Sequence, residues 1–178
     1  MRDEALSRHL GRPVRLARSR PDGARLERLT PEVETGAGEL TRCALAAGTP
    51  GDTFVDFAPI HVIMAATLDA LSADHRRFRP NVVLRMLDPK PFAENEWTGR
   101  TLRVGDRAAL RVIVPTPRCA VPTLAQGNGL PDDGDVLRTA ARLNRVPVLD
   151  LGLRTCVGAY ASVHTGGTLR LGDRVMVA

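Results

Sequence analysis

Apolar residues recur at helical spacing in the segment between Pro59 and Ala73. Five of them would share one face of a helix, namely Ile60, Ile63, Met64, Leu68 and Leu71. Pro59 suits the first turn of such a helix, and Asp56 is a candidate N-terminal cap. The pattern therefore predicts a helix over residues 59–73.

A second helix is predicted over residues 136–144, where apolar positions again follow helical spacing. Asp135 would cap this helix, and Pro147 would prevent its continuation. Gly, Pro and Asp dominate residues 127–134, which we interpret as a mobile surface loop.

Short apolar runs rich in β-branched residues predict several strands. They cover residues 82–84, 100–104, 108–114, 158–164, 168–171 and 175–177. Gly105-Asp106 predicts a hairpin turn between two of them. Residues 1–50 mix charge with Pro and Gly and form an irregular entry segment with one or two strands. The expected fold is mostly β with a few helices, a barrel or sandwich, within a single domain over residues 1–178.

A thiol lies beside a guanidinium where one predicted strand ends, at Arg118-Cys119. Pro115 and Pro117 cannot donate to a sheet ladder, so we expect the strand to stop there and Cys119 to lie in a loop. A neighbouring arginine favours the thiolate, which attacks electrophiles or binds a soft metal. A free cysteine can also be a small buried hydrophobe, and the local sequence leaves both interpretations open.

Charge and composition favour an anionic small-molecule partner. The formal net charge is +5, and Lys90 is the only lysine, so arginine carries almost all of the positive charge. Arginine suits bidentate recognition of phosphate. Aromatic residues make up only 3% of the chain, and no zinc finger or stacking platform is present. A phosphorylated small molecule therefore ranks above nucleic acid.

The three cysteines are far apart and form no CxxC or Cys/His cluster, which favours a reduced, cytoplasmic protein. No run approaches the ~20 apolar residues of a membrane helix, so no membrane association is expected. Cys156 follows Arg154 closely and is either a resolving thiol for Cys119 or, more simply, a buried residue. His61 is a candidate general acid or base, although such a histidine is more often part of the core. Trp97 is expected in the core.

Four motifs occur in an order and spacing that resemble MOSC domains, the molybdenum cofactor sulfurase C-terminal domains. They are Arg77-Phe78-Arg79-Pro80-Asn81-Val82-Val83, Phe92-Ala93-Glu94-Asn95-Glu96-Trp97, Leu102-Arg103-Val104-Gly105 and Pro115-Thr116-Pro117-Arg118-Cys119. The resemblance runs from about residue 9 to residue 175 and is to the branch that includes the amidoxime-reducing component. No counterpart of that branch's N-terminal companion domain occurs in this sequence.

The resemblance implies a MOSC-type β-barrel that carries a molybdopterin cofactor, with Cys119 as the catalytic residue and molybdenum ligand. It also implies a cofactor-binding set, which is Arg77, Arg79, Asn81, Arg118 and Thr123. By the same analogy the protein is an oxidoreductase that reduces N-hydroxylated or N-oxide small molecules with a reductase partner.

Two other functions are compatible with the same residues. One is a sulfur carrier or cofactor-binding module, in which Cys119 holds a persulfide formed without pyridoxal phosphate. The missing companion domain motivates this alternative, and it also suggests a homodimer whose second copy completes the site. The other is a metal-free enzyme that uses the MOSC scaffold for a different anionic small molecule.

Overall fold

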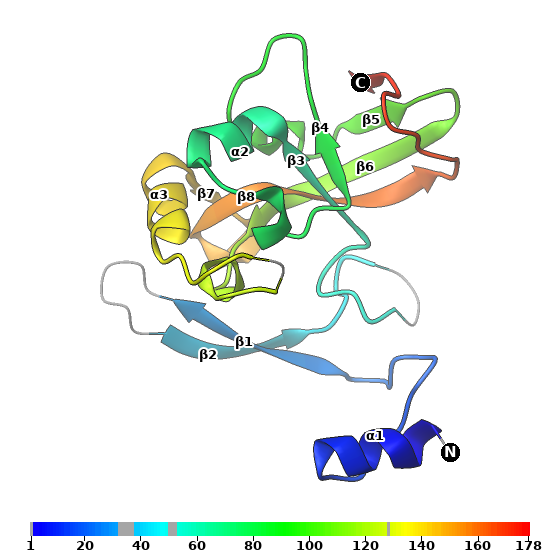
Figure 1. The fold of residues 1–178 in the computed structure, drawn as a ribbon. Coiled ribbons are helices and arrows are strands. Elements are labelled where there is room, and N and C mark those ends of the chain that lie inside the picture. Colours follow the sequence, from blue (N-terminus) through cyan, green and yellow to red (C-terminus); the bar gives the residue numbers. More distant parts are fainter. Residues whose placement is uncertain (1, 32–37, 50–52, 128) are drawn as a thin grey trace.

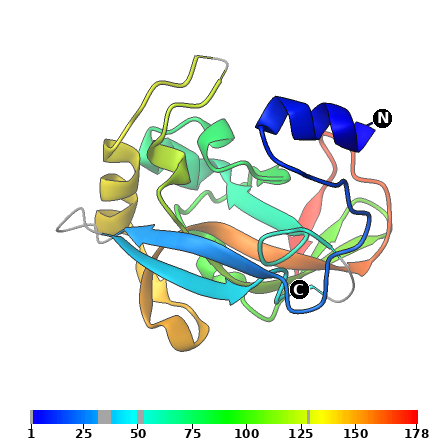
Figure 2. The ribbon, with the colours of Figure 1, turned by 90° about the horizontal axis from the view of Figure 1, so that it is seen from below.

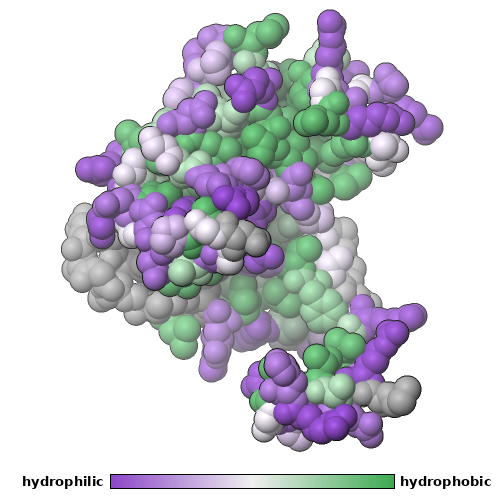
Figure 3. All heavy atoms as spheres, viewed as in Figure 1, coloured by the Kyte–Doolittle hydropathy of each residue, from purple (hydrophilic) through white to green (hydrophobic). Residues whose placement is uncertain are grey.

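The computed structural model describes residues 2–31, 38–49, 53–127 and 129–178. Its N-terminal part holds helix α1 (Arg2–Leu10) and a two-stranded antiparallel sheet of β1 (Arg25–Pro31) and β2 (Gly38–Ala44). The two strands lie beneath the main body of the fold (Figures 1 and 2). Helix α1 was not predicted; it buries no residue, and Figure 3 shows it standing apart with mostly hydrophilic side chains on its visible surface.

The main body is a seven-stranded sheet that curls into a nearly closed barrel (Figure 1). Its strands are β3 (Ile60–Met64), β4 (Val82–Leu84), β5 (Thr101–Val104), β6 (Ala108–Pro117), β7 (Arg145–Pro147), β8 (Leu153–Thr165) and β9 (Val175–Val177). Neighbouring strands follow the order β4-β3-β8-β6-β5-β9, and β7 pairs with β8. Only the β3–β4 pair is parallel. The prediction of a mostly β fold with a few helices is confirmed.

Apolar side chains from the strands fill the barrel. The largest cluster of buried residues includes Val62, Leu102, Leu110, Val112 and the buried Trp97. A second cluster packs α2 (Ala65–Leu71) and α3 (Asp135–Leu143) against β3 and β8. Four 3-10 helices complete the fold: η1 (His75–Arg77), η2 (Ala93–Trp97), η3 (Val121–Thr123) and η4 (Leu149–Leu151).

The predicted helix over residues 59–73 is wrong in its first half. Ile60–Met64 forms β3, and the helix begins only at Ala65. Strand β3 is antiparallel to β8 on one edge and parallel to β4 on the other, and all its residues after Ile60 are buried. A strand that is covered on both faces is apolar without alternation, so its pattern resembles that of a helix.

Strand β6 continues through the two prolines that were expected to end it. Pro115 lies opposite Ala159 and Pro117 opposite Cys156, with register shifts after Val112 and after Pro115. These bulges accommodate residues that have no N–H to donate. Strand β6 therefore ends at Pro117, three residues later than predicted, and Cys119 still lies in the loop that follows it.

Two smaller predictions are also corrected. Asp135 is the first residue of α3 and Gly134 is its N-cap, so Asp135 does not cap the helix with its side chain. Residues 168–171 are irregular, and β9 pairs with β5, so the C-terminal segment crosses to the other edge of the sheet. In the described parts of the chain, no helix has the length and apolar character needed to cross a membrane.

Candidate functional site

Two loops that are distant in the sequence meet beside Cys119. The first, residues 77–81, links η1 to β4, and the second, residues 118–123, follows β6. Arg118 joins them, because its Nη2 donates to the carbonyl oxygen of Phe78 at 3.4 Å and its guanidinium lies 5.4 Å from the centre of the Phe78 ring. The backbone N–H of Arg118 donates to Thr155 at 2.9 Å, which fixes this loop against β8.

Arg77 is buried, at 4% exposure, and holds three segments together. Its terminal nitrogens donate to the carbonyl oxygens of Pro122 at 3.2 Å and Pro131 at 2.8 Å. Nη2 also lies 3.8 Å from a carboxylate oxygen of Asp133. These contacts attach the loop that follows Cys119 to the chain that precedes α3.

Arg79 and Asn81 lie on the exposed side of loop 77–81. Arg79 has a φ of 53°, a left-handed conformation that is uncommon for a residue with a side chain. Asn81 is fixed to the start of β3, since its Oδ1 accepts from the N–H of His61 at 2.7 Å and its own N–H donates to the His61 carbonyl at 2.9 Å. Among the described residues, the Arg79 guanidinium and the Asn81 Nδ2 have no hydrogen-bond partner, so both remain available to a ligand.

Cys119 is half-buried and lies next to Arg118 in the second loop. The chain turns directly after it into η3, where the Thr123 hydroxyl donates to the carbonyl of Ala120 at 2.7 Å. Thr123 therefore stabilises the turn, and its hydroxyl oxygen keeps its capacity to accept. The structure thus places all six predicted site residues on two adjoining loops.

His61 lies in β3 and not on a helix, and its ring is buried behind the same loops. Its Nε2 donates to the carbonyl oxygen of Val157 at 3.1 Å. Burial, with a smaller contribution from the positive charge of Arg118, lowers the pKa of His61 to about 4. The imidazole is therefore neutral at neutral pH and acts as a structural hydrogen-bond donor, which favours the core interpretation.

Gly158 allows β8 to pass close to His61. Its φ is +81°, and a Cβ at this position would meet Ile63 and the Val62 carbonyl oxygen at 2.6 Å, with the His61 Nε2 nearer still. The role of Gly158 was not predicted, although an isolated glycine inside a strand pattern is a signal of close backbone approach.

Glu94 belongs to the motif of residues 92–97, and the sequence alone indicates no role for it. It is fully buried, and its carboxylate accepts from the Thr67 hydroxyl at 3.0 Å and from the N–H of Met64 at 3.4 Å, at the start of α2. Burial raises the pKa of Glu94. The carboxyl group connects η2 to the junction of β3 and α2.

Cys156 is fully buried in β8, and burial raises the pKa of its thiol to about 12. Its carbonyl oxygen accepts from the Asn144 Nδ2 at 2.8 Å, and its N–H donates to the Asn144 carbonyl at 3.1 Å. A thiol that stays protonated and enclosed is a poor partner in thiol exchange, so the structure favours the core interpretation of Cys156.

Comparison with protein-family models matches residues 51–176 to the MOSC domain. This chain belongs to the MOSC domain family. The match covers both loops of the site and the barrel strands from β3 into β9, and it identifies the domain without selecting the amidoxime-reducing branch. A search of curated proteins found no match to the sequence. MOSC domains are linked to redox chemistry of the molybdenum cofactor.

The groups around Cys119 fit a ligand that carries a phosphate and a soft metal. Thiolate is a soft donor, and the guanidiniums of Arg79 and Arg118 suit an anion. Thr116, three residues before Cys119, has a fully buried hydroxyl with no hydrogen-bond partner among the residues that the structure describes. A buried unpaired polar group costs about 1–3 kcal/mol, so the Thr116 hydroxyl is a local cost within β6.

Proposed function

We propose that this MOSC domain binds the molybdenum cofactor between loop 77–81 and loop 118–123 and uses it to reduce N-hydroxylated or N-oxide small molecules. The observation that carries the proposal is the meeting of Cys119, Arg118, Arg79 and Asn81 on these adjoining loops. Family membership supports the cofactor, and the donor set at the site fits it.

Each residue has a distinct task in this proposal. Cys119 supplies the protein's sulfur ligand to molybdenum, and Arg118 holds the loop of Cys119 against loop 77–81. Arg79 and Asn81 bind polar groups of the pterin and its phosphate. Arg77 acts as a positioning residue, because its buried guanidinium fixes the turn that presents Cys119. The hydroxyl of Thr123 is placed to accept one further hydrogen bond.

The bound molybdenum supplies two-electron redox chemistry. Reduction of an N–OH group to N–H releases water and consumes two electrons and two protons. The electrons come from a reductase partner, and the protons come from solvent. The protein's contribution is to hold the cofactor and leave one side of the site open to substrate.

The first test is the molybdenum and pterin content of protein purified from a host that makes the cofactor. The wild type should carry both in near-stoichiometric amounts, and Cys119→Ser should carry several-fold less molybdenum. Cys43→Ser is a matched control, because Cys43 is an exposed free thiol on β2. Wild-type protein without molybdenum, or equal loss in both variants, would refute the proposal.

The half-buried thiol of Cys119 also supports the sulfur-carrier function. A persulfide donor would transfer its outer sulfur to Cys119 and leave as a thiol, so that Cys119 becomes a persulfide. Intact-mass analysis after incubation with such a donor should then show one added sulfur that a reductant removes and that Cys119→Ser does not acquire. An unchanged mass would exclude this second function.

A further inference from the structure

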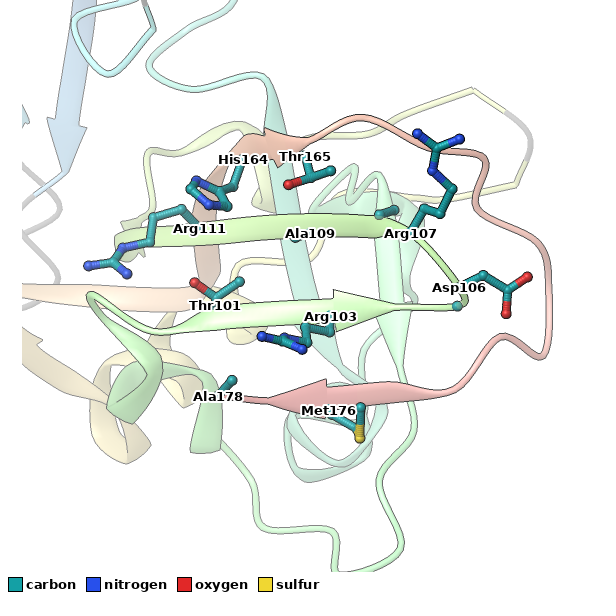
Figure 4. Close-up of a pocket in the computed structure, with 12 residues that line it drawn as sticks. Thr101, Arg103, Asp106, Arg107, Ala109, Arg111, His164, Thr165, Met176 and Ala178 are labelled. Atoms are coloured by element: carbon teal, nitrogen blue, oxygen red, sulfur yellow. The ribbon is translucent and has the colours of Figure 1, made fainter.

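A second concave site lies on the outer face of the barrel, where β5, β6, β8 and β9 are side by side (Figure 4). The recess has a volume of about 560 Å³. Such a volume is typical of small-molecule sites. The recess lies near the β5–β6 hairpin, and Arg111 lines it. Cys119 is eight residues further along the chain, a distance of about 25 Å at the usual rise per strand residue. The two sites are therefore separate.

The alternation of side chains along the strands produces this surface. Leu102 and Leu110 point into the core, whereas Arg103 and Arg111 are exposed on the opposite face. Ala109 lies directly across from Arg103, and its small side chain leaves the space that the arginines surround. Figure 4 shows Ala109 at the centre of the recess.

The positive charges are arranged at both ends of the recess. Arg103 and Arg111 point toward the same end, with Thr101 between them and His164 beside Arg111 (Figure 4). Arg107 lies at the other end, next to Asp106. Within the described parts of the chain, no carboxylate forms an ion pair with Arg103, Arg107 or Arg111. Like charges on neighbouring strands repel one another, and an anion between them would remove that repulsion.

A smaller hollow of about 300 Å³ continues from Arg107 along the segment after β8. It adds Thr168, Arg170 and Asp173 to the polar lining, and the Asp173 carboxylate accepts from the N–H of Arg170 at 2.7 Å. Gly167 makes this arrangement possible, since a Cβ there would meet Ala108 at 3.0 Å. The segment therefore lies against the start of β6 and forms a wall around Arg107.

We propose that this outer recess is a second anion-binding site, for a small molecule that carries two or more phosphate groups. Arginine binds phosphate oxygens bidentately, and the separated positive ends favour an extended polyanion over a single phosphate. The site does not depend on the cofactor proposed at Cys119, and its ligand is a different molecule. Its position on the outer face makes it accessible while the Cys119 site is filled.

The test is calorimetric titration of the full chain with inorganic tripolyphosphate and, separately, with orthophosphate. Tripolyphosphate should bind at least tenfold more tightly than orthophosphate. The variant Arg103→Gln/Arg111→Gln should weaken tripolyphosphate binding by about tenfold or more, as expected for loss of charged hydrogen bonds. A comparison with ATP then distinguishes a nucleotide from an inorganic polyphosphate, and tight binding of either supports the site.

Two control variants separate this site from other sources of binding. Arg142→Gln/Arg145→Gln removes the same charge from exposed positions elsewhere in the fold and should change the affinity by less than twofold. Arg79→Gln, at the proposed cofactor site, should leave the affinity for tripolyphosphate unchanged. Undetectable tripolyphosphate binding, or equal weakening by the two double variants, would overturn the proposal. Weakening by Arg79→Gln alone would also overturn it, because the anion would then occupy the Cys119 site.

Discussion

Replacement of Gly158 by alanine should destabilise the protein strongly, because two independent costs meet at this position. The first is conformational: the φ of +81° suits glycine, and an L-residue with a side chain pays about 1–2 kcal/mol there. The second is steric: the new Cβ would meet Ile63 and the Val62 carbonyl oxygen at 2.6 Å, and the backbone oxygen cannot move aside without disturbing β3. Overpacking of this kind costs about 1–3 kcal/mol.

Together these costs predict that Gly158→Ala lowers the free energy of unfolding by about 2–5 kcal/mol. Urea unfolding, followed by the fluorescence of the single buried tryptophan, Trp97, measures the change. Gly99→Ala is the matched control, since Gly99 has a φ of +78° with no atom within 4 Å of an added Cβ. The control should lose only the conformational part, about 1–2 kcal/mol. Equal losses in the two variants would refute the claim that β8 approaches β3 too closely at His61 to admit a side chain at position 158.

Two further predictions concern buried charge. Because the pKa of His61 falls from 6.5 to about 4 on folding, its contribution to stability is complete above pH 6.5 and is lost as the pH falls toward 4, by about 3 kcal/mol. His61→Leu should remove this loss from the unfolding curves, whereas the exposed His75→Gln should retain it; an unchanged pH dependence in His61→Leu would contradict the assignment. Arg77→Met should lower the free energy of unfolding by about 2–4 kcal/mol, since it removes charged hydrogen bonds from a buried guanidinium to the carbonyl oxygens of Pro122 and Pro131. Its exposed neighbour provides the control, and Arg76→Gln should cost much less, because its ion pair with Asp74 is exposed to solvent; similar losses in the two variants would count against the role of Arg77.

The parts of the fold that local sequence determines were predicted well. The hairpin at Gly105-Asp106 joins β5 to β6, and the strand at residues 82–84 is β4. Both depend on turn residues and β-branched runs that act over a few positions. Helix α3 was likewise predicted within a residue at each end.

The errors arose where tertiary contacts decide the structure. Ile60–Met64 is a strand because it pairs with β4 on one edge and with β8 on the other. These partners lie elsewhere in the sequence, so the segment by itself does not indicate them. Residues 168–171 looked like a strand, but the chain crosses to β5 and pairs only at β9. In β6, the register shifts after Val112 and after Pro115 allow a strand that contains two prolines.

At the site, too, local sequence predicted the segments involved, whereas tertiary contacts determine what each residue does. The motifs identified the two loops, but the sequence could not show that Arg77 would be buried against Pro122 and Pro131 while Arg79 stays exposed. Nor could it show that His61 would be neutral, since that follows from its burial behind Arg118. These distinctions depend on which groups the fold encloses, and they assign separate structural and ligand-binding tasks to residues that share one motif.

Molybdenum X-ray absorption spectroscopy on the purified holoprotein counts the sulfur atoms bound to the metal and so tests whether Cys119 is a ligand. The molybdenum that remains bound to Cys119→Ser should have one sulfur ligand fewer than that of the wild type, while Cys43→Ser should match the wild type. An identical sulfur count in wild type and Cys119→Ser would show that Cys119 does not ligate the metal.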